Sequence, residues 1–315
     1  MKANDLYALV KSAAPIAGVT VGNEGDKATW AVDWGASSAP EIAAGEALIA
    51  AVSDVDTATV EAPRMNFDCK LIVTSSLAIQ LSNHNGDQIF INGQNYPIAQ
   101  YAVNLGNTGL AAATLYYVYA YWTGLKVALE LSTTGHAVDP TWGHRTKGST
   151  PSRTYVGMVY MGAGTPGTFV DSDTQRFCAS YYNRINKPVQ RALIANRATT
   201  AAPHVELDSA ERIEFISHGD EHALVWLNAI AANSNAGTDT YGALGLDGIS
   251  TLLARTVFYS ADAGNLFAFG KMQGQQFSAG YHYLTPVGGT SGGGARTATY
   301  YAGGDPTRFG AMLRQ

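Results

Sequence analysis

The sequence predicts a mainly β protein, with tandem antiparallel β-sandwich, jelly-roll-like domains behind a small N-terminal α+β module. Charged residues make up 14% of the chain, against roughly 25% in ordinary soluble domains. The 34 glycines among 315 residues supply many turns. Short runs of aromatic and β-branched residues alternate with period two between these turns, as strands do. No unit of about 20 to 50 residues repeats, so a solenoid or propeller is not expected.

The first module, residues 1–62, combines a strand with a helix. Lys27–Trp34 alternates, with Trp30 and Trp34 on one face. Ser38 and Glu41 form a capping-box pattern in which each side chain is expected to accept the other residue's backbone N–H. The helix is expected to end near Ser53 and to pack through an Ala-rich stripe made of Ile42, Ala43, Ala44, Ala47, Leu48, Ala51 and Val52.

The second module, residues 63–188, is expected to be a β-sandwich domain. Thr114–Trp122 is a nine-residue run with apolar side chains on both faces, which indicates a strand buried on both sides. It pairs with Leu125–Leu131 through a predicted two-residue turn at Thr123-Gly124. Arg153–Met161 and Thr174–Tyr182 predict two more strands, joined by a loop rich in Gly and Pro.

The third module, residues 189–315, shows the same pattern and is expected to be a C-terminal jelly-roll-like sandwich. Its expected strands are His204–Leu207, Arg212–Ser217, Ala223–Ile230, Thr240–Leu246, Thr256–Tyr259, Leu266–Gly270, Gly280–Thr285 and Thr297–Tyr301.

Charge and cysteine usage narrow the classes of partner. The net charge of −5, without a basic run, argues against nucleic acid, because phosphate binding needs a cationic surface. Met1–Val21 lacks the apolar core of a signal peptide and the length of a membrane span, so we expect a protein that stays soluble. Cys69 and Cys178 are expected to be packed thiols.

Two motifs resemble metal or cofactor sites, and their flanks argue against both. His218-Gly219-Asp220-Glu221-His222 matches a zinc-peptidase pattern. Alternating apolar residues on both sides favour a hairpin tip instead, and no third ligand is apparent. Gly162–Gly167 resembles a dinucleotide fingerprint, but the residues after it are β-like. The glycine tract Gly288–Gly294 is expected to be a flexible surface loop.

No catalytic, cofactor-binding or metal-binding residue is therefore predicted, and we expect a protein that is not an enzyme. The carboxylate pairs Asp171/Asp173 and Asp54/Asp56 lie in Ser- and Thr-rich turns, where Asp caps its own backbone. Residues in short aromatic clusters are the candidates for contact with a receptor or with another subunit, because aromatic faces stack on flat sugars and also pack between proteins. These candidates are Trp142, Tyr281, His282, Tyr283, Tyr300 and Tyr301.

Three stretches resemble bacteriophage tail-fibre and head-fibre (spike) proteins. The first is Gly25–Trp34 with the Ala-rich helix after it. The second is the run Thr114–Tyr121, Leu129–His136 and Arg153–Tyr160, closed by Ser180–Arg184, and it is the most specific of the three. The third is Ser278–Tyr283.

This resemblance implies a virion component, assembled in the cytoplasm of the bacterial host. Such a subunit forms a homotrimer, attaches to tail or capsid proteins and contacts the host surface, including its glycans. The first module, with Trp30, Trp34 and Leu48, is the expected anchor. Two alternatives remain open: a polysaccharide depolymerase of the tailspike kind, and a purely structural tail or capsid protein without a receptor. Neither nucleic acid nor membrane insertion is expected.

Overall fold

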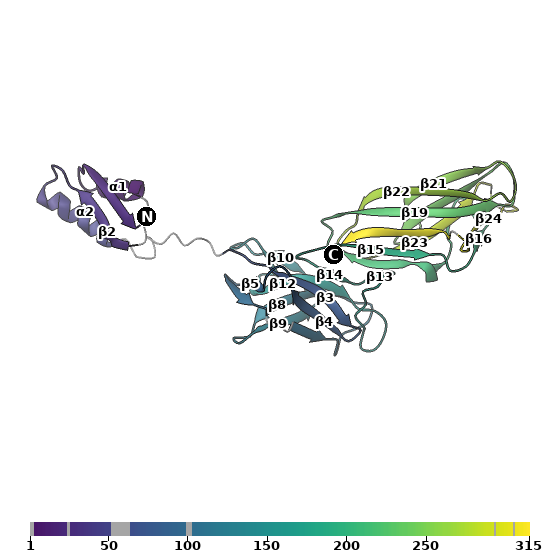
Figure 1. The fold of residues 1–315 in the computed structure, drawn as a ribbon, viewed down its shortest axis with the longest axis horizontal. Coiled ribbons are helices and arrows are strands. Elements are labelled where there is room, and N and C mark those ends of the chain that lie inside the picture. Colours follow the sequence, from purple (N-terminus) through teal and green to yellow (C-terminus); the bar gives the residue numbers. More distant parts are fainter. Residues whose placement is uncertain (1–2, 24–25, 52–63, 99–102, 293, 305) are drawn as a thin grey trace. The chain divides into compact units, whose positions relative to one another are not determined.

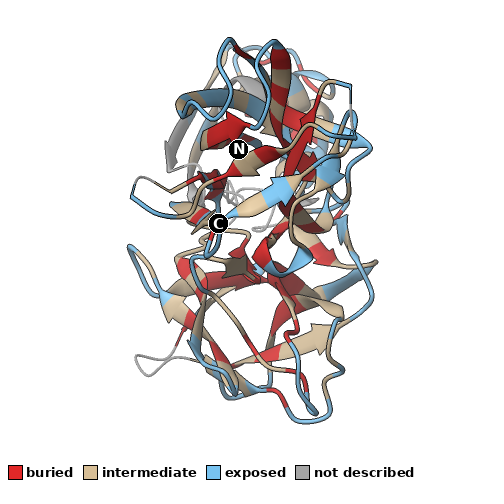
Figure 2. Cartoon of the chain, turned by 90° about the vertical axis from the view of Figure 1, so that its right-hand side faces the viewer, coloured by how far each residue is buried: buried red, intermediate tan, exposed pale blue. Residues whose placement is uncertain are grey.

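The computed structural model describes residues 3–23, 26–51, 64–98, 103–292, 294–304 and 306–315 (Figure 1). The chain divides into two compact units, Met1–Arg64 and Met65–Gln315. The predicted mainly β class is confirmed, because antiparallel sheets account for most of the described chain. Buried and exposed residues alternate along many strands (Figure 2). No helix in the described part has the length and apolar character to cross a membrane.

The first unit contains α1 (Ala3–Lys11), β1 (Gly18–Asn23), β2 (Asp26–Asp33) and α2 (Ala39–Ala51). The strand expected over Lys27–Trp34 corresponds to β2, which pairs antiparallel with β1. Helix α1 was not predicted, although apolar residues with helical spacing line one of its faces. Leu6 and Val10, four positions apart on that face, are fully buried. Trp30 and Trp34 pack against this small core.

Helix α2 begins as predicted but buries a different face. The Ser38 N–H donates to Glu41 Oε2 at 2.7 Å, which confirms half of the capping box. The Ser38 hydroxyl donates to the same oxygen instead of accepting a backbone N–H. The predicted stripe is wrong for Ala43, Ala44 and Ala47, which are exposed, whereas Gly45 is buried. Val52 and the helix end expected near Ser53 lie outside the described residues. A Cβ on Gly45 would lie 2.5 Å from Trp34 Cζ3, so the tryptophan ring occupies the space that glycine leaves.

The second unit has two lobes, each built around its own hydrophobic core. In the first lobe, a six-stranded sheet has the order β10-β11-β12-β8-β9, with β14 also paired to β12. A three-stranded sheet, β3-β4-β7, and the pair β5-β6 complete it. The strands are β3 (Cys69–Ser75), β4 (Ala78–Asn83), β5 (Gln88–Ile91), β6 (Gln94–Pro97), β7 (Val103–Gly106), β8 (Leu115–Trp122), β9 (Val127–Ser132), β10 (His136–Val138), β11 (Arg145–Lys147), β12 (Thr150–Tyr160) and β14 (Cys178–Ser180).

Two predictions for the first lobe can be compared directly with the structure. Cys69 and Cys178 are free and buried, as expected, and burial raises the pKa of each thiol to about 12. Strands β8 and β9 form the predicted hairpin, but the turn lies one residue later than expected. Thr123 closes it by pairing with Lys126, so Gly124 and Leu125 occupy the tip. Gly124 has a φ of +95°, which glycine adopts without strain.

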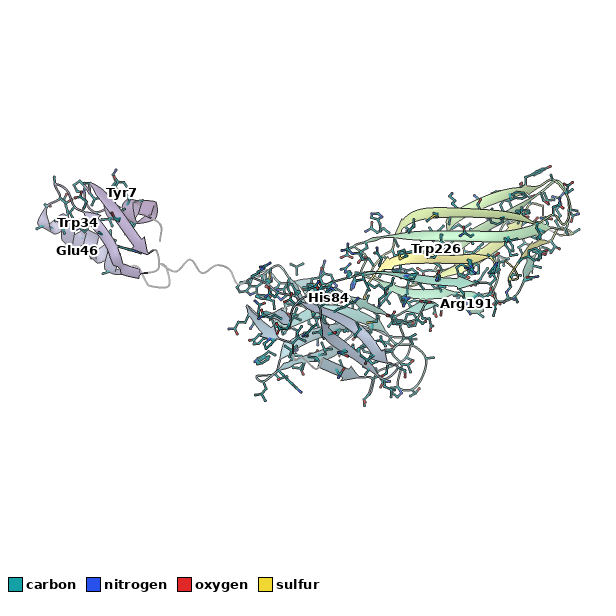
Figure 3. The ribbon with its side chains drawn as sticks, in the orientation of Figure 1. Tyr7, Trp34, Glu46, His84, Arg191 and Trp226 are labelled. Carbon is teal, nitrogen blue, oxygen red and sulfur yellow. The ribbon has the colours of Figure 1, made fainter. Side chains whose placement is uncertain are left out.

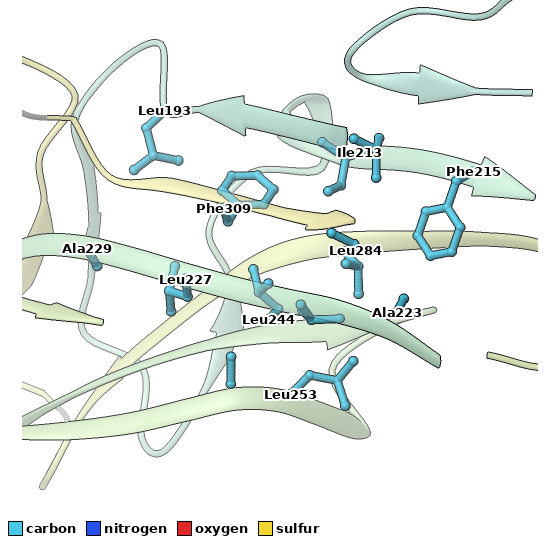
Figure 4. Close-up of a cluster of buried hydrophobic side chains, with 14 of the residues drawn as sticks. Leu193, Ile213, Phe215, Ala223, Leu227, Ala229, Leu244, Leu253, Leu284 and Phe309 are labelled. Atoms are coloured by element: carbon cyan, nitrogen blue, oxygen red, sulfur yellow. The ribbon is translucent and has the colours of Figure 1, made fainter. Parts of the chain in front are cut away.

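The second lobe is a sandwich of two six-stranded sheets, β13-β18-β23-β20-β21 with β17, and β15-β25-β19-β24-β16 with β22. Leu227, Leu244 and Phe309 are among the side chains that fill the space between them (Figure 4). The elements are β13 (Gln175–Arg176), β15 (Asn186–Ala192), β16 (Arg197–Thr199), β17 (Val205–Glu206), the 3-10 helix Ser209–Glu211, β18 (Ile213–Ser217), β19 (His222–Asn233), β20 (Thr238–Leu246), β21 (Thr251–Ser260), β22 (Phe267–Gln276), β23 (Gly280–Thr290), β24 (Ala298–Tyr300) and β25 (Arg308–Arg314).

Two predictions for the second lobe are wrong. The segment 218–221 is not a hairpin tip, because β18 pairs with β13 and β23 while β19 belongs to the other sheet. The segment therefore crosses between the sheets. The glycine tract does not begin as a flexible loop: Gly288 and Gly289 are buried in β23. A Cβ on Gly288 would clash with the Tyr300 ring, and one on Gly289 with the Pro203 carbonyl.

The two lobes meet through a small apolar cluster of Met158, Ala179 and Ile216, each at most 2% exposed. Beside it, the rings of Tyr160 and Tyr281 stack with centroids 4.4 Å apart. The lobes of the second unit therefore share buried surface.

Candidate functional site

A pocket of about 360 Å³ in the first lobe gathers aromatic side chains from three parts of the sequence. Trp142 and His144 lie in the loop between β10 and β11. Phe67 precedes β3, and Tyr181 and Tyr182 follow β14. The complete lining is Met65, Phe67, Val138, Trp142, Gly143, His144, Arg145, Tyr181 and Tyr182.

The loop that carries Trp142 is held by its own backbone and by one buried carboxylate. Asp139 is 3% exposed, and its Oδ1 accepts the N–H groups of Thr141 (2.8 Å) and Trp142 (2.9 Å). The Asp139 N–H donates to the His144 carbonyl at 2.7 Å, which closes the loop. Because Asp commonly bonds its own backbone two residues on, this local sequence favours the turn. Trp142 is therefore positioned before any ligand arrives.

The pocket wall combines stacked rings with a cation. The Phe67 and Tyr182 rings stack with centroids 4.0 Å apart and an interplanar angle of 5°. Trp142 meets the Phe90 ring edge-on at 5.5 Å, and its six-membered ring lies against Gly93. The Arg145 Nε donates to the Tyr181 hydroxyl at 2.8 Å. Such a surface offers apolar faces for stacking and a guanidinium for hydrogen bonds to hydroxyl or carboxylate oxygens.

Two buried polar atoms beside the pocket have no hydrogen-bond partner in the described part of the chain. They are His144 Nδ1 and the Tyr182 hydroxyl. Burial lowers the pKa of His144 and raises the pKa of Tyr182 well above its ordinary value, so both groups are neutral near pH 7. Because an unpaired buried polar group is costly, a ligand or water that reached these atoms would be stabilising.

Carboxylates are absent from the residues that the structure places around this pocket. A glycosidase needs two carboxyl groups on either side of the scissile bond, and this lining supplies none. These lining residues therefore lack the carboxylate pair of a glycosidase.

A larger depression of about 590 Å³, lined in part by His84, Tyr181 and Arg314, does contain carboxylates (His84 is labelled in Figure 3). Asp220 and Glu221 both accept hydrogen bonds from the Arg184 guanidinium, Asp220 at 2.8 and 3.1 Å. Burial raises the pKa of Asp220, but the Arg184 hydrogen bond and charge outweigh it and lower that pKa overall. Asp220 is thus ionised near neutral pH and is not poised to act as a general acid.

The other motifs singled out in the sequence have structural partners. His218 uses both ring nitrogens, Nδ1 with the Tyr155 hydroxyl at 3.2 Å and Nε2 with the Ser180 carbonyl at 3.1 Å. Asp171 pairs with Arg176 and Lys187, and Asp173 with Arg176. Within the described chain, no cluster of three or more potential metal ligands occurs. No helix follows Gly162–Gly167. Asp54 and Asp56 lie outside the described residues.

The remaining aromatic candidates lie apart from the pocket. Tyr281 stacks on Tyr160 between the lobes and donates to Glu214. His282 is buried, with Nδ1 2.8 Å from Asp247 Oδ2. Tyr283 lies under the Arg212 guanidinium. Tyr300 is 1% exposed and donates to the Tyr241 carbonyl, so it is a core residue. Tyr301 is half-buried.

The anchor candidates all belong to the first unit. Trp30 and Trp34 are partly buried against its core, and Leu48 is half-buried on α2. None of them is a freely exposed apolar residue.

The sequence indicated Trp142 as a candidate but did not indicate Phe67, Tyr181 or Tyr182 as its neighbours in a pocket. The Tyr181-Tyr182 pair could have been selected from the sequence, because it consists of two adjacent tyrosines, as does the selected pair Tyr300-Tyr301. Phe67 belongs to a run in which Met65, Phe67, Cys69 and Leu71 alternate with polar residues, and such a run predicts a strand but no pocket. Only the folded chain brings Phe67 and Trp142 to one pocket.

Comparisons with known proteins give distant similarities only. No family model matches the chain, and no curated protein does. Among solved structures, the insecticidal δ-endotoxin Cry8Ea1 from Bacillus thuringiensis is 10% identical, with a TM-score of 0.26, over 79% of this chain and 52% of the endotoxin. The VP2 subviral particle of infectious bursal disease virus is 12% identical, with a TM-score of 0.27, over 80% of this chain and 78% of VP2. An exo-β-1,3-galactanase from Phanerochaete chrysosporium, solved with galactose, is 9% identical, with a TM-score of 0.21, over 74% and 65%. This chain spans about half of the endotoxin, and likeness at these scores assigns no function.

Proposed function

We propose that the chain is a non-enzymatic virion structural subunit of the fibre or spike kind, which self-associates, attaches to the particle through its first unit and contacts host-surface glycan. The resemblance to phage fibre proteins supports the virion role. The observation that supports glycan contact is the Trp142 pocket, where stacked aromatic rings and Arg145 surround about 360 Å³ without a carboxylate.

We expect a single pocket of this kind to bind one sugar weakly, and repeated copies to compensate. When several copies engage the same surface, each later contact becomes intramolecular and the overall affinity rises by orders of magnitude. Attachment to a polysaccharide therefore needs neither a deep cleft nor catalysis. The low content of charged residues, 14%, also suits a chain that buries its surface against other subunits.

Binding of purified capsular polysaccharide and lipopolysaccharide, measured by biolayer interferometry, tests the proposal. Trp142→Ala is expected to weaken monovalent binding roughly tenfold, the effect of losing about 1.4 kcal/mol. Tyr259→Ala, at a tyrosine that is 62% exposed outside the pocket, is the matched control and should bind as the parent does. Thermal melting of both variants checks folding.

Three results would reject the proposal. Unchanged binding by Trp142→Ala would remove the pocket from the interaction. Release of new reducing ends from the glycan by the purified protein would favour the depolymerase alternative. A purely structural role would be favoured by two findings together. Particles would assemble only when the subunit is present, and they would adsorb normally when the subunit lacks residues 191–315 and carries Trp142→Ala.

A further inference from the structure

The outward face of the sheet that contains β19 carries a group of large apolar residues, where an exposed sheet face is normally polar. Along β19, the inward residues Ala223 to Ala231 at alternate positions are at most 7% exposed. The outward positions between them include Leu224, which is 41% exposed, and the partly exposed Trp226 (labelled in Figure 3). On the neighbouring strands, Met272 is 61% exposed and Met312 is 37% exposed.

Strand register arranges these outward side chains in rows. Leu224 lies opposite Met312 on β25 and Gly274 on β22. One row on, Trp226 lies between Gly310 and Met272. A Cβ on Gly310 would clash with the Trp226 ring, so the ring extends toward β25 and leaves Met272 uncovered on the other side. The next row places Asn228 beside Gly270.

The first two rows thus pair a large apolar residue on β19 with a glycine or a methionine on β22. A two-fold axis parallel to the strands, between β19 and β22, would place β19 of one copy over β22 of the other in the same rows. Leu224 would then enter the space above Gly274, where an added Cβ meets no atom within 4 Å. Trp226 would contact Met272, a favourable sulfur–aromatic pair. The face is therefore complementary to itself, as a two-fold interface must be.

The distribution of charge is compatible with the same packing. Among the outward positions of β15, β25, β19 and β22, the charged residues are Arg308 and Arg314, both on β25. The two-fold packing carries the β25 strands to opposite borders, so the arginines do not meet. Trp, Met and Arg are enriched at protein interfaces, and Asp and Glu are depleted, which is the composition of this face.

A groove of about 380 Å³ extends the apolar surface past Asn228, with Ile230, Ala268 and Pro306 in its walls. From these observations we infer that the β19–β22 face of the second lobe binds the same face of a second copy of this chain. The inference rests on the self-association in the proposed function, for which it specifies the surface and an assembly of two chains where the family resemblance implies three. It does not depend on the glycan pocket.

Sedimentation velocity of the full chain over a concentration series tests the inference. The parent is expected to reach the mass of two chains. Met272→Asp and Gly274→Arg, which introduce charge into the centre of the face, are each expected to raise the dimer dissociation constant about 30-fold or more, the effect of losing one 2 kcal/mol hot spot. Gly274→Arg is useful because its site is open in the single chain, so the fold should tolerate it.

Leu125→Asp is the matched control, because it places the same charge at a residue that is 89% exposed on the other lobe, and it should dimerise as the parent does. Dimers unaffected by both face variants, a parent that stays monomeric, or a species of three chains would each overturn the inference. Binding of a monomeric parent to phosphatidylcholine–phosphatidylglycerol vesicles, lost in Met272→Asp, would assign the face to lipid instead. Glycan binding is measured on the monomeric variants as well. Its outcome tests the glycan contact of the proposed function separately from dimerisation.

Discussion

At the scale of single residues, His218 belongs to a motif typical of metal sites, but in this fold it forms contacts between the two lobes. Its ring contacts Tyr155 and Tyr181, and both nitrogens have hydrogen-bond partners. The pKa of His218 is lowered to about 3, first by burial and then by the charge of Arg184; Asp220 opposes the shift and His136 adds to it. The folded protein therefore keeps this imidazole neutral.

We expect stability to depend on pH through His218. An unfolded histidine titrates near 6.5, so only the unfolded chain gains this proton as the pH falls from about 6.5 toward 3. The stability contributed by neutral His218 is complete above pH 6.5 and is lost below it, on the order of a few kcal/mol over the whole interval. In thermal melts from pH 7 to 4, His218→Gln should show a shallower loss of Tm than the parent.

His84→Gln is the control for that series, and it should retain the parent's pH dependence. An equally steep loss of Tm in His218→Gln would assign the acid sensitivity to other groups, with His136, whose pKa burial also lowers, as the first to examine.

At the scale of elements, a buried asparagine joins the two sheets of the second lobe. Asn233 ends β19, and its Nδ2 donates to the Thr240 hydroxyl on β20 at 3.2 Å and to the Thr290 hydroxyl on β23 at 3.0 Å. Asn233 and both threonines are at most 1% exposed. These bonds fix the ends of strands that belong to different sheets.

We expect Asn233→Ala to lower the free energy of unfolding by about 1–3 kcal/mol, because it removes two buried hydrogen bonds and leaves a small cavity. Urea unfolding measures the change. Asn104→Ala, at an exposed position of β7, should stay within roughly 0.5 kcal/mol of the parent. If both substitutions lowered the free energy of unfolding equally, the buried hydrogen bonds of Asn233 would contribute nothing to stability.

At the scale of the whole molecule, the second unit is expected to unfold as one body because its lobes share a buried cluster. Ile216 extends from the second lobe into that cluster and is 1% exposed. Placing a carboxylate there buries a charge without a partner, which costs several kcal/mol. Calorimetry of Ile216→Asp should therefore resolve two transitions where the parent shows one for this unit.

Ile194→Asp is the matched control, since Ile194 is 71% exposed and the same charge stays in water. It should keep the single transition. A parent in which the two lobes already melt separately would contradict the coupling.

Much of the local structure could be predicted from the sequence. Alternation of side chains predicted the strand that forms β2 and the β8–β9 hairpin, because a residue's face in a strand depends on its immediate neighbours. The burial of Cys69 and Cys178 and the capping contact from Glu41 to Ser38 also followed from local pattern. Helix α1 and the inward face of α2 were not predicted. The inward face of α2 depends on tertiary packing, because Gly45 is buried where the Trp34 ring lies against it.

The sequence by itself determined the β class, the low surface charge and most strand positions. Only the tertiary structure decided which sheet each strand joins and which side chains share a pocket. Strands β18 and β19 look like one hairpin in the chain, yet they belong to opposite sheets, and Phe67 meets Trp142 only in the folded lobe. The physical reason is that alternation reflects nearest neighbours along the chain, whereas sheet order and pockets depend on hydrogen bonds and packing between distant segments.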